Sequence, residues 1–207
     1  MRWFTGDFHL GHESELGGVI KYCNRPFANV VEMNETIINN CNSLVQKQDE
    51  LYFLGDFAFS KDRKKWLKIY RHFREQINCR HIILIAGNHD PHYKDGSPKK
   101  ELLQFFEKIY TTMIVREQGH KIYLNHYANR VWPNSHYGSY HCSAHSHGTL
   151  PDDIDSLSMD VGIDAIAKRL SIESNHNVIA QDYRPISFDE IKGWMCEKNW
   201  KSPLKKR

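Results

Sequence analysis

Short apolar runs in this sequence repeatedly end in clusters of glycine, aspartate, asparagine and histidine. The runs cover residues 3–5, 51–54, 81–86, 122–124 and 140–144, and the polar clusters that follow them are residues 6–9, 55–56, 87–90, 125–127 and 145–148. Short runs rich in β-branched and aromatic residues are typical of buried strands. The pattern therefore predicts a sheet-rich chain whose polar chemistry is concentrated at the strand ends.

Patterns with helical spacing separate several of these runs. The predicted helices are residues 31–45, 61–73, 99–109 and 187–199, the last opened by a capping-box sequence. Residues 165–177 are read as a helix followed by a loop, and Gln118-Gly119 as a hairpin turn. Because strand and helix alternate in the first half and strand dominates in the second, we expect an α/β layered fold with its site at the strand ends.

The bulk composition is that of an ordinary globular domain. With 207 residues, 40% hydrophobic and 26% charged, the chain is expected to form one domain, residues 1–207, with a basic tail at about 201–207. A net charge of +3 gives no broad nucleic-acid footprint. The five cysteines contain no C-x-x-C pair, and no run reaches the roughly 18 apolar residues of a membrane span. We therefore expect a cytoplasmic protein without a signal peptide or membrane contact.

The polar clusters hold the residues most capable of binding metal or moving protons. They are Asp7, His9, Asp56, Asn88, His89, His126, His145 and His147. If their segments are extended, Asp7 and His9 point the same way and could grip one ion, and the same holds for His145 and His147. Carboxylate, amide and imidazole ligands without thiolates suit manganese, iron or zinc. Leaving His89 aside, this set is too large for one small ion and suits two ions that share a carboxylate.

Each of these fragments also has a simpler explanation. A lone Asp-x-His is more often surface polarity than a metal site, and Gly-Asp after a strand is more often a turn. His145 and His147 could be satisfied core histidines, or they could form a separate small metal site with His136, His141 and Cys142. The occurrence of a metal-capable group at five separate strand ends is what favours one shared site.

In their order along the chain, these blocks resemble the calcineurin-like metallophosphoesterase superfamily, whose blocks run D-x-H, G-D, G-N-H-[DE], H and G-H-x-H. Here they stand as Asp7-Phe8-His9, Gly55-Asp56, Gly87-Asn88-His89-Asp90, His126 and Ala144-His145-Ser146-His147. A small bacterial and phage-type branch is indicated by His12 and by residues 22–27, 33–35 and 184–187. The resemblance implies a four-layer αββα sandwich of two mixed sheets flanked by helices.

The resemblance also implies a role for each block. The implied ligand sets are Asp7, His9 and His147 for one ion, and Asn88, His126 and His145 for the other. Asp56 would bridge the two ions, whereas His89 would face the substrate phosphate and the leaving group. Two divalent ions are expected, with manganese favoured and iron, zinc or nickel as alternatives.

The implied activity is hydrolysis of phosphoesters by a metal-bridging hydroxide, with no covalent enzyme intermediate. The expected substrate is a small or nucleotide-like phosphoester, cleaved by a phosphodiesterase or phosphatase. A nuclease is the alternative enzyme, although the small net charge does not favour it. A non-catalytic scaffold is the alternative from another class, although a scaffold would be expected to have lost ligands and none is missing.

Three further residues are candidates for substrate contacts. They are His12, Arg25 and Arg130. For His12 a structural role in its loop is an equal alternative, and for Arg25 a structural cross-link between loops is favoured over substrate binding. Asp160 and Asp164 are expected to be turn or hydrogen-bonding residues.

The sequence departs from the family pattern in places that narrow the prediction. Ala144 stands where the last block has glycine, and Ala128 where a related block has proline. The G-D block lacks the D-R-G extension, and Asp90 replaces the glutamate of the protein serine/threonine phosphatases. Protein phosphatase activity is therefore disfavoured.

Overall fold

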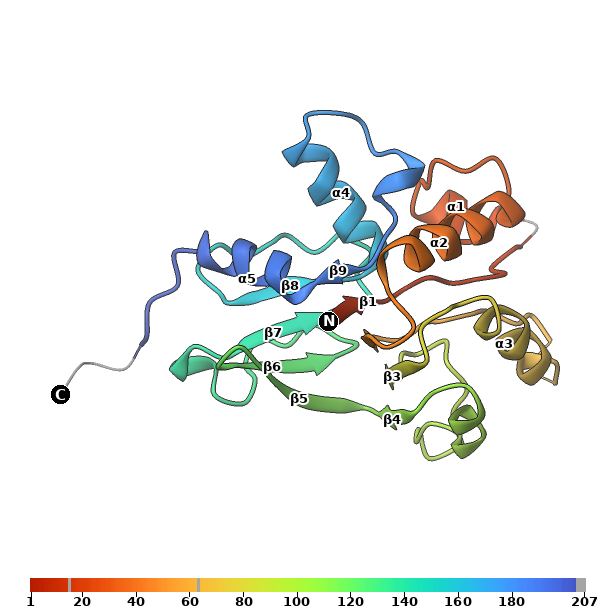
Figure 1. Ribbon diagram of the computed structural model, residues 1–207, viewed down its shortest axis with the longest axis horizontal. Coiled ribbons are helices and arrows are strands. Elements are labelled where there is room, and N and C mark those ends of the chain that lie inside the picture. Colours follow the sequence, from red (N-terminus) through yellow and green to blue (C-terminus); the bar gives the residue numbers. More distant parts are fainter. Residues whose placement is uncertain (15, 63, 204–207) are drawn as a thin grey trace.

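Two mixed β-sheets pack face to face, and helices flank them (Figure 1). The computed structural model describes residues 1–14, 16–62 and 64–203, so residues 204–207 of the predicted basic tail lie outside the described part. The predicted fold class, an α/β sandwich of two mixed sheets with flanking helices, is confirmed. Among the described residues, no helix combines the length and the apolar character that crossing a bilayer requires.

The larger sheet has the strand order β4-β3-β2-β1-β9. Its strands are β1 (Arg2–Thr5), β2 (Glu50–Phe53), β3 (His81–Ile85), β4 (Lys108–Tyr110) and β9 (Ile186–Ser187). The first four are parallel, and only the short β9 runs antiparallel, beside β1. Successive side chains alternate between two cores: Trp3 packs into the core on the outer face, and Phe4 into the core between the sheets.

The smaller sheet has the strand order β5-β6-β7-β8. Its strands are β5 (Thr112–Glu117), β6 (His120–Asn125), β7 (Tyr140–Ser143) and β8 (Ser158–Asp160). The predicted hairpin joins β5 to β6 through Gln118 and Gly119, whose φ angles of 46° and 83° are those that a tight two-residue turn needs. From β6 to β8 the strands are parallel.

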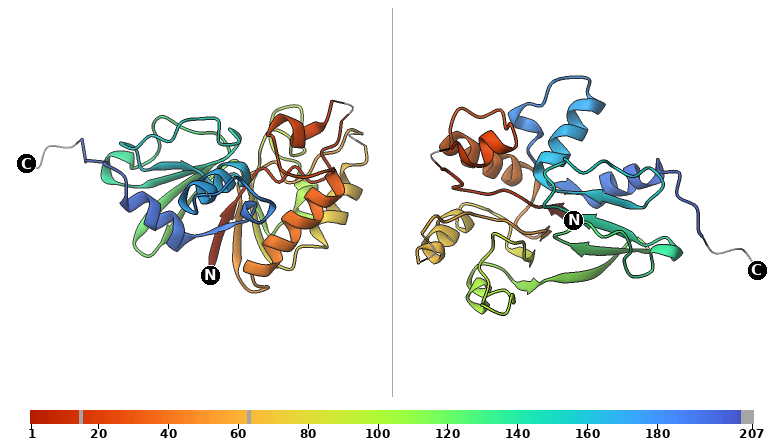
Figure 2. Two further views of the ribbon diagram at one scale, coloured as in Figure 1. Left: turned by 90° about the horizontal axis from the view of Figure 1, so that it is seen from above. Right: turned by 180° about the vertical axis from the view of Figure 1, so that it is seen from behind.

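Helices α2 (Val30–Leu44) and α3 (Trp66–Arg74) cover the outer face of the larger sheet (Figure 2). The side chain of Asn29 begins α2 by accepting two backbone hydrogen bonds of 3.0 Å from its first turn. The helix packs through a buried stripe at helical spacing, which consists of Met33, Ile37, Ile38 and Cys41. Both helices follow from the apolar periodicity of their sequences, but α3 begins at Trp66 and not at the predicted residue 61, and residue 63 lies outside the described part.

Helices α4 (Ile163–Glu173) and α5 (Phe188–Cys196) pack against the core between the sheets. The predicted capping box begins α5: the Ser187 backbone N–H donates to the Glu190 carboxylate at 2.8 Å, and the Glu190 N–H donates back to the Ser187 hydroxyl at 3.3 Å. The short helices are α1 (Gly18–Tyr22) and the 3-10 turns η1 (Lys100–Gln104), η2 (Ser135–Tyr137) and η3 (Ala180–Asp182).

The predicted helix at residues 99–109 is wrong beyond its first turns. Only η1 forms there, and the chain then extends into β4, where Lys108 pairs with Ile83. The buried side chains of Phe105 and Phe106 anchor the connection. The free edge of β3 offers unpaired backbone groups to an extended segment, and this tertiary pairing overrides the local helical pattern.

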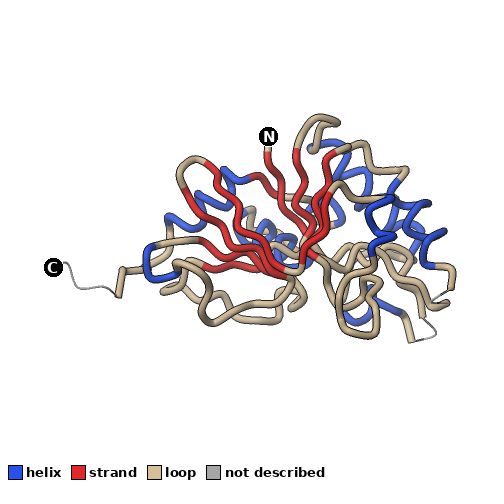
Figure 3. The backbone as a smooth tube through the Cα atoms, turned by 90° about the horizontal axis from the view of Figure 1, so that it is seen from below, coloured by secondary structure: helices blue, strands red, loops and turns tan. Residues whose placement is uncertain are grey.

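The topology gathers the strand ends at one place. Parallel strands end at the same edge of a sheet, so β1, β2 and β3 release their loops together, as do β6 and β7 in the other sheet. Figure 3 shows the strands of both sheets converging toward a common end. Loops that are far apart in the sequence therefore meet there.

Candidate metal centre

Every residue of the predicted metal and proton-transfer set lies in a loop that leaves one of these converging strands. The loops after β1, β2, β3, β6 and β7 carry, in order, Asp7 and His9, Asp56, Asn88 and His89, His126, and His145 and His147. Their side chains form overlapping groups whose potential ligand atoms lie within 4.8 Å of one another. The structure thus assembles in space what the sequence scatters over 140 residues.

Two of these groups match the predicted ligand sets. Asp7, His9 and His147 form one group, and Asp56, His126 and His145 form another. Asn88 joins the second group, because its Oδ1 lies 3.0 Å from Nε2 of His126.

The carboxylate of Asp56 stands between the two groups. Its Oδ2 is 3.5 Å from Nε2 of His9 and 3.6 Å from Nε2 of His126. One oxygen atom therefore faces a ligand of each set, which is the geometry expected of a carboxylate that two cations share.

Buried polar atoms without partners test whether this site fits metal ions. Asp7 Oδ1 and both ring nitrogens of His9 are buried and have no hydrogen-bond partner among the described residues. An unsatisfied buried polar atom costs about 1–3 kcal/mol, so protein interiors rarely leave one. A cation would satisfy Asp7 Oδ1 and one of the two His9 ring nitrogens, and the donor set fits a borderline divalent metal.

The electrostatics of the site point the same way. Burial raises the pKa of Asp7 well above its usual value, and burial followed by the nearby Asp90 carboxylate raises that of Asp56 to about 7. Burial lowers the pKa of the His9 imidazole, which keeps a lone pair free for a metal. The protein alone disfavours charge on both carboxylates, and bound cations would reverse that preference.

The predicted extended geometry of the D-x-H and H-x-H segments is wrong. Asp7, His9, His145 and His147 have φ angles of 57°, 51°, 67° and 49°, in the left-handed region, and so has Asp56 at 57°. Tight turns rather than strand alternation bring the paired side chains together. Non-glycine residues in such conformations cost on the order of 1 kcal/mol each or more, and they cluster at functional sites.

Backbone groups orient the ligands of the second set. Nδ1 of His126 donates to the Leu54 carbonyl at 2.6 Å, which leaves Nε2 for a metal. The His89 backbone N–H donates to Oδ1 of Asp56 at 2.8 Å, and this bond leaves Oδ2 facing His9 and His126. Across the site, the His145 N–H donates to Oδ2 of Asp7 at 2.8 Å and links the two sheets.

Asp90 positions the metal-capable loops, a role that its sequence pattern did not predict. Its buried carboxylate accepts hydrogen bonds from the backbone N–H groups of Asp56, Gly87 and Phe57, at 3.0, 2.8 and 3.2 Å. It also accepts the Tyr70 hydroxyl at 2.6 Å. The last residue of the G-N-H-D block therefore fixes the loops that carry Asp56 and Asn88, and these four hydrogen bonds engage both of its carboxylate oxygens.

Arg25 and Asp164 form a fully buried ion pair behind the first ligand set. The guanidinium contacts both Asp164 oxygens at 2.8 and 2.7 Å, and it donates to the backbone carbonyls of Asp7 at 2.7 Å and Phe8 at 2.9 Å. Oδ2 of Asp164 in turn accepts Nδ1 of His147 at 2.6 Å. Although burial alone would raise it, the Arg25 charge keeps the pKa of Asp164 below its usual value. The Arg25 guanidinium is therefore a loop cross-link with no free donor aimed at substrate.

Two glycines let the ligand loops pack closely. A Cβ on Gly55, whose φ is 91°, would lie 2.5 Å from the Gly87 nitrogen and 2.6 Å from Nδ1 of His126. Ala144 fits where the family block has glycine because its methyl faces Gly6, which has no side chain; a Cβ there would lie only 2.9 Å away. The change at Ala144 thus leaves the following histidines in place.

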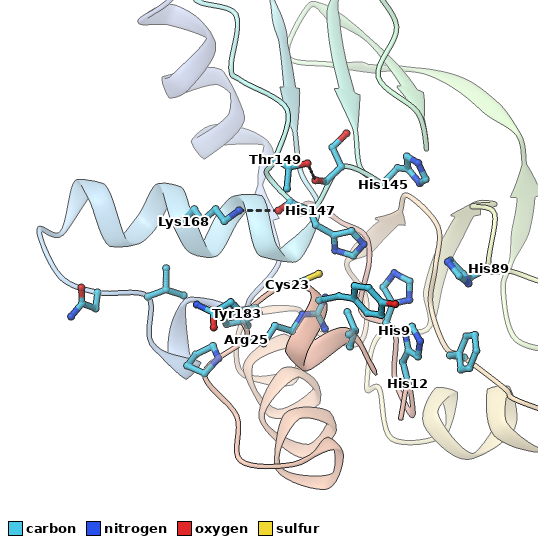
Figure 4. A pocket seen from close by; sticks show the side chains of 18 residues that line it. His9, His12, Cys23, Arg25, His89, His145, His147, Thr149, Lys168 and Tyr183 are labelled. Atoms are coloured by element: carbon cyan, nitrogen blue, oxygen red, sulfur yellow. Dashed lines mark hydrogen bonds between the residues drawn. The ribbon is translucent and has the colours of Figure 1, made fainter. Parts of the chain in front are cut away.

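The metal-capable cluster opens into a pocket of about 1390 Å³ (Figure 4). His89 and His12 both line it, and the half-buried His12 ring stacks on Phe59 with centroids 4.1 Å apart. Arg130 is not part of this pocket; it lines a neighbouring one of about 850 Å³. The structure therefore places one of the three substrate-contact candidates, His12, with its ring beside His89.

The alternative small metal site at His136, His141 and Cys142 is not assembled among the described residues. Nδ1 of His141 lies 3.1 Å from the Tyr123 carbonyl, and its Nε2 accepts the Asn129 N–H at 3.0 Å. Cys142 points into the core between the sheets. His141 is thus a hydrogen-bonded structural histidine.

Comparison with known proteins agrees with this geometry. A family model of calcineurin-like phosphoesterases matches residues 2–200. An uncharacterized protein of Methanocaldococcus jannaschii is 32% identical over 189 residues, which cover 91% of this chain and 88% of that protein. The crystal structure of a protein of unknown function from Aquifex aeolicus has a TM-score of 0.59 at 21% identity and covers 94% of this chain and 98% of its own. The last likeness shows a shared fold.

Replacing Gly87 with alanine should disrupt the metal centre. The added methyl would lie 2.6 Å from Cε1 of His126 and collide with the Asp56 carboxylate. We expect a stability loss of about 1–3 kcal/mol in thermal or urea unfolding, together with loss of bound Mn²⁺ measured by elemental analysis. Gly193→Ala is the matched control, because a Cβ there meets nothing within 4 Å and should stabilise α5. Normal metal content in Gly87→Ala would contradict this packing.

Asp164→Asn should weaken metal binding at the first ligand set. The change replaces the charged acceptor that orients His147 with a neutral amide and leaves the buried Arg25 charge unpaired. We expect metal affinity, measured by calorimetry on the folded protein, to fall by about 10- to 100-fold. Asp49→Asn is the control, since Asp49 is also buried and hydrogen-bonded but accepts from Met1 and Trp3 at the start of β1. It should lower stability and leave metal affinity unchanged; equal effects in both variants would contradict the orienting role.

Proposed function

This chain belongs to the calcineurin-like phosphoesterase family and is a metal-dependent phosphoester hydrolase, and we propose that it uses two divalent cations to hydrolyse small or nucleotide-like phosphoesters. The observation that carries the dinuclear proposal is the position of Asp56, whose Oδ2 lies between His9 and His126. Manganese is the favoured ion, because oxygen and imidazole donors without thiolates suit it.

The proposed ligands follow the two groups that the structure assembles. Asp7, His9 and His147 would hold one ion, Asn88, His126 and His145 the other, and Asp56 would be shared. When bound, two such cations activate water and neutralise charge on the phosphoryl oxygens. The protein's own contribution is to hold these donors before substrate arrives, through Asp90, Asp164 and the Leu54 carbonyl.

His89 is proposed to act on the substrate. Its exposed imidazole lines the pocket, with its centroid 5.1 Å from that of His9 and 5.8 Å from that of Phe59. A group so placed can stabilise the phosphoryl oxygens or protonate the leaving alkoxide. Water attacks phosphorus directly in this proposal, so no covalent enzyme intermediate forms.

His89→Ala should separate catalysis from metal binding. Removing a positioned acid lowers turnover by about 10²- to 10⁴-fold, whereas the ligand sets stay complete. Turnover of an aryl phosphodiester and bound Mn²⁺ should be measured together, with the exposed His136→Ala as control. Because His89 also lies within 4.8 Å of His9 and Asp56, loss of both ions in His89→Ala would show that it is a ligand instead.

The proposed function itself is tested by Mn²⁺-dependent hydrolysis of p-nitrophenyl phosphate and bis(p-nitrophenyl) phosphate. The wild type should cleave at least one of them, and Asp56→Asn should lose at least roughly 100-fold in rate, more than the loss of an outer-shell partner costs. Asp62→Asn removes an exposed carboxylate and should change neither activity nor bound metal. Failure of the metal-loaded wild type to cleave either ester would overturn the proposal.

A further inference from the structure

The pocket at the metal centre is much larger than a phosphate group requires. Its volume of about 1390 Å³ exceeds the usual 300–1,000 Å³ or so of small-molecule sites. One end is formed by the histidines of the metal centre. The remainder is an arm between α1 with its following loop, the loop after β7, and α4 with the segment that precedes η3. The arm offers room for an organic group attached to the phosphate.

The wall of this arm is partly apolar. Val19, Tyr22, Val178 and Tyr183 contribute to it, and Tyr22 is 77% exposed at the end of α1. Val178 is partly buried, and Val19 and Tyr183 are only 2% exposed. Aromatic and aliphatic side chains around a concave surface are the usual lining of sites for organic ligands.

The charge of the lining is one-sided. Among the described residues that line the pocket, none is aspartate or glutamate, whereas Lys168 and several histidines are present; the lining Arg25 is already paired with the buried Asp164. The acidic side chains of the metal centre are buried behind its histidines. An anionic ligand therefore meets no carboxylate at the part of the pocket surface that the described residues form.

Lys168 supplies a cation held in place at the far side of the arm. Its ammonium donates to the backbone carbonyls of His147 and Gly148, both at 3.1 Å. Both acceptors are neutral, and no carboxylate of the described residues forms an ion pair with Lys168. In Figure 4, Lys168 and His89 stand on opposite sides of the His9 and His147 rings. The His147 imidazole lies in the metal-capable cluster, and its backbone carbonyl accepts the hydrogen bond from Lys168. The Lys168 ammonium therefore lies away from the place where the scissile phosphate would bind.

We propose that this arm binds the organic group of the phosphoester and that Lys168 binds a second anionic group on it. The ligand class is an organic phosphodiester that carries a phosphate besides the scissile one, as a nucleoside bisphosphate derivative does. The inference rests on the proposed function, because the scissile phosphate is taken to lie at the metal-capable cluster. It adds a site at α4, outside all of the ligand blocks.

A matched pair of chromogenic diesters tests the second-anion site. Thymidine 5′-(p-nitrophenyl phosphate) and its 3′-phosphorylated form share the leaving group and differ in one phosphate. With Mn²⁺-loaded wild type, the 3′-phosphate should lower KM roughly fivefold, as one partly solvated ion pair can, with little change in kcat. Lys168→Gln should abolish this difference, and Lys168→Arg should keep it.

The control is Lys21→Gln, which removes the same charge from an exposed position on α1 that does not line the pocket. It should keep the KM difference, and thermal unfolding of all variants shows whether Lys168→Gln remains folded. Equal KM values for the two diesters in the wild type, or a difference that survives in Lys168→Gln, would overturn the second-anion site.

Nucleotide-binding measurements test this inference independently of the proposed function. If the wild type cleaves neither thymidine diester, calorimetry with thymidine 5′-monophosphate and thymidine 3′,5′-bisphosphate decides on the site, whereas the proposed function is decided by hydrolysis of the two aryl esters. Tighter binding of the bisphosphate that is lost in Lys168→Gln supports the second-anion site. Equal binding of the two nucleotides overturns it.

Discussion

The buried carboxylate of Asp90 holds the metal-capable loops together without belonging to the ligand set. It accepts hydrogen bonds from the backbone of both the Asp56 loop and the Gly87 loop, and it is anchored by the Tyr70 hydroxyl from α3. Strand ends alone would bring the loops near one another but would not set the conformation of each. Because the acceptor is a charged group in a buried place, its hydrogen bonds are stronger than neutral ones. The outer helix layer is thereby coupled to the metal centre.

On the opposite side of the site, a buried ion pair fixes the positions of the loops. The buried Arg25 joins the backbone of Asp7 and Phe8 to Asp164 on α4, and Asp164 orients His147. A buried ion pair is not a reliable source of stability, since desolvation of both charges offsets most of the attraction. In this site the ion pair contributes by fixing the positions of the residues that it contacts. The pair ties the loop after β1 to the loop after β7, which come from different sheets.

The Asp90 hydrogen bonds and the Arg25–Asp164 pair are needed because the backbone conformations and buried charges of the ligand cluster are energetically unfavourable. Five of its residues have positive φ angles, Asp7 and Asp56 resist ionisation, and His9 has no hydrogen-bond partner among the described residues. The rest of the fold must overcome these costs before any cation binds. A site prepared in this way binds cations without first having to rearrange its donors, which is the condition for electrostatic preorganisation.

The sequence predicted the elements with strong local signals and missed those decided by tertiary contacts. The capping box at Ser187 and the turn at Gln118 need only local hydrogen bonds and backbone angles, and both are observed. Residues 108–110 read as helix but form β4, because pairing with β3 outweighs their local pattern. Tertiary contacts also hid the partners of Asp90 and Asp164, which lie up to 139 residues away, although Asp164 was correctly expected to be a hydrogen-bonding residue.

Lys168 lies outside the metal-binding blocks, and its position bears on which phosphoester the pocket accepts. The metal-binding blocks can be recognised because the chemistry of phosphoester hydrolysis fixes which donors they need. Apart from the loop after β7, the arm of the pocket is built from α1, α4 and the segment before η3, which carry none of those donors and are therefore free to vary in shape and charge. Selectivity among phosphoesters is set where the organic group lies, not where the phosphate lies. A protein of this family should therefore be distinguished from its relatives by the residues of this arm, and here the arm presents one fixed ammonium and no carboxylate among its described residues.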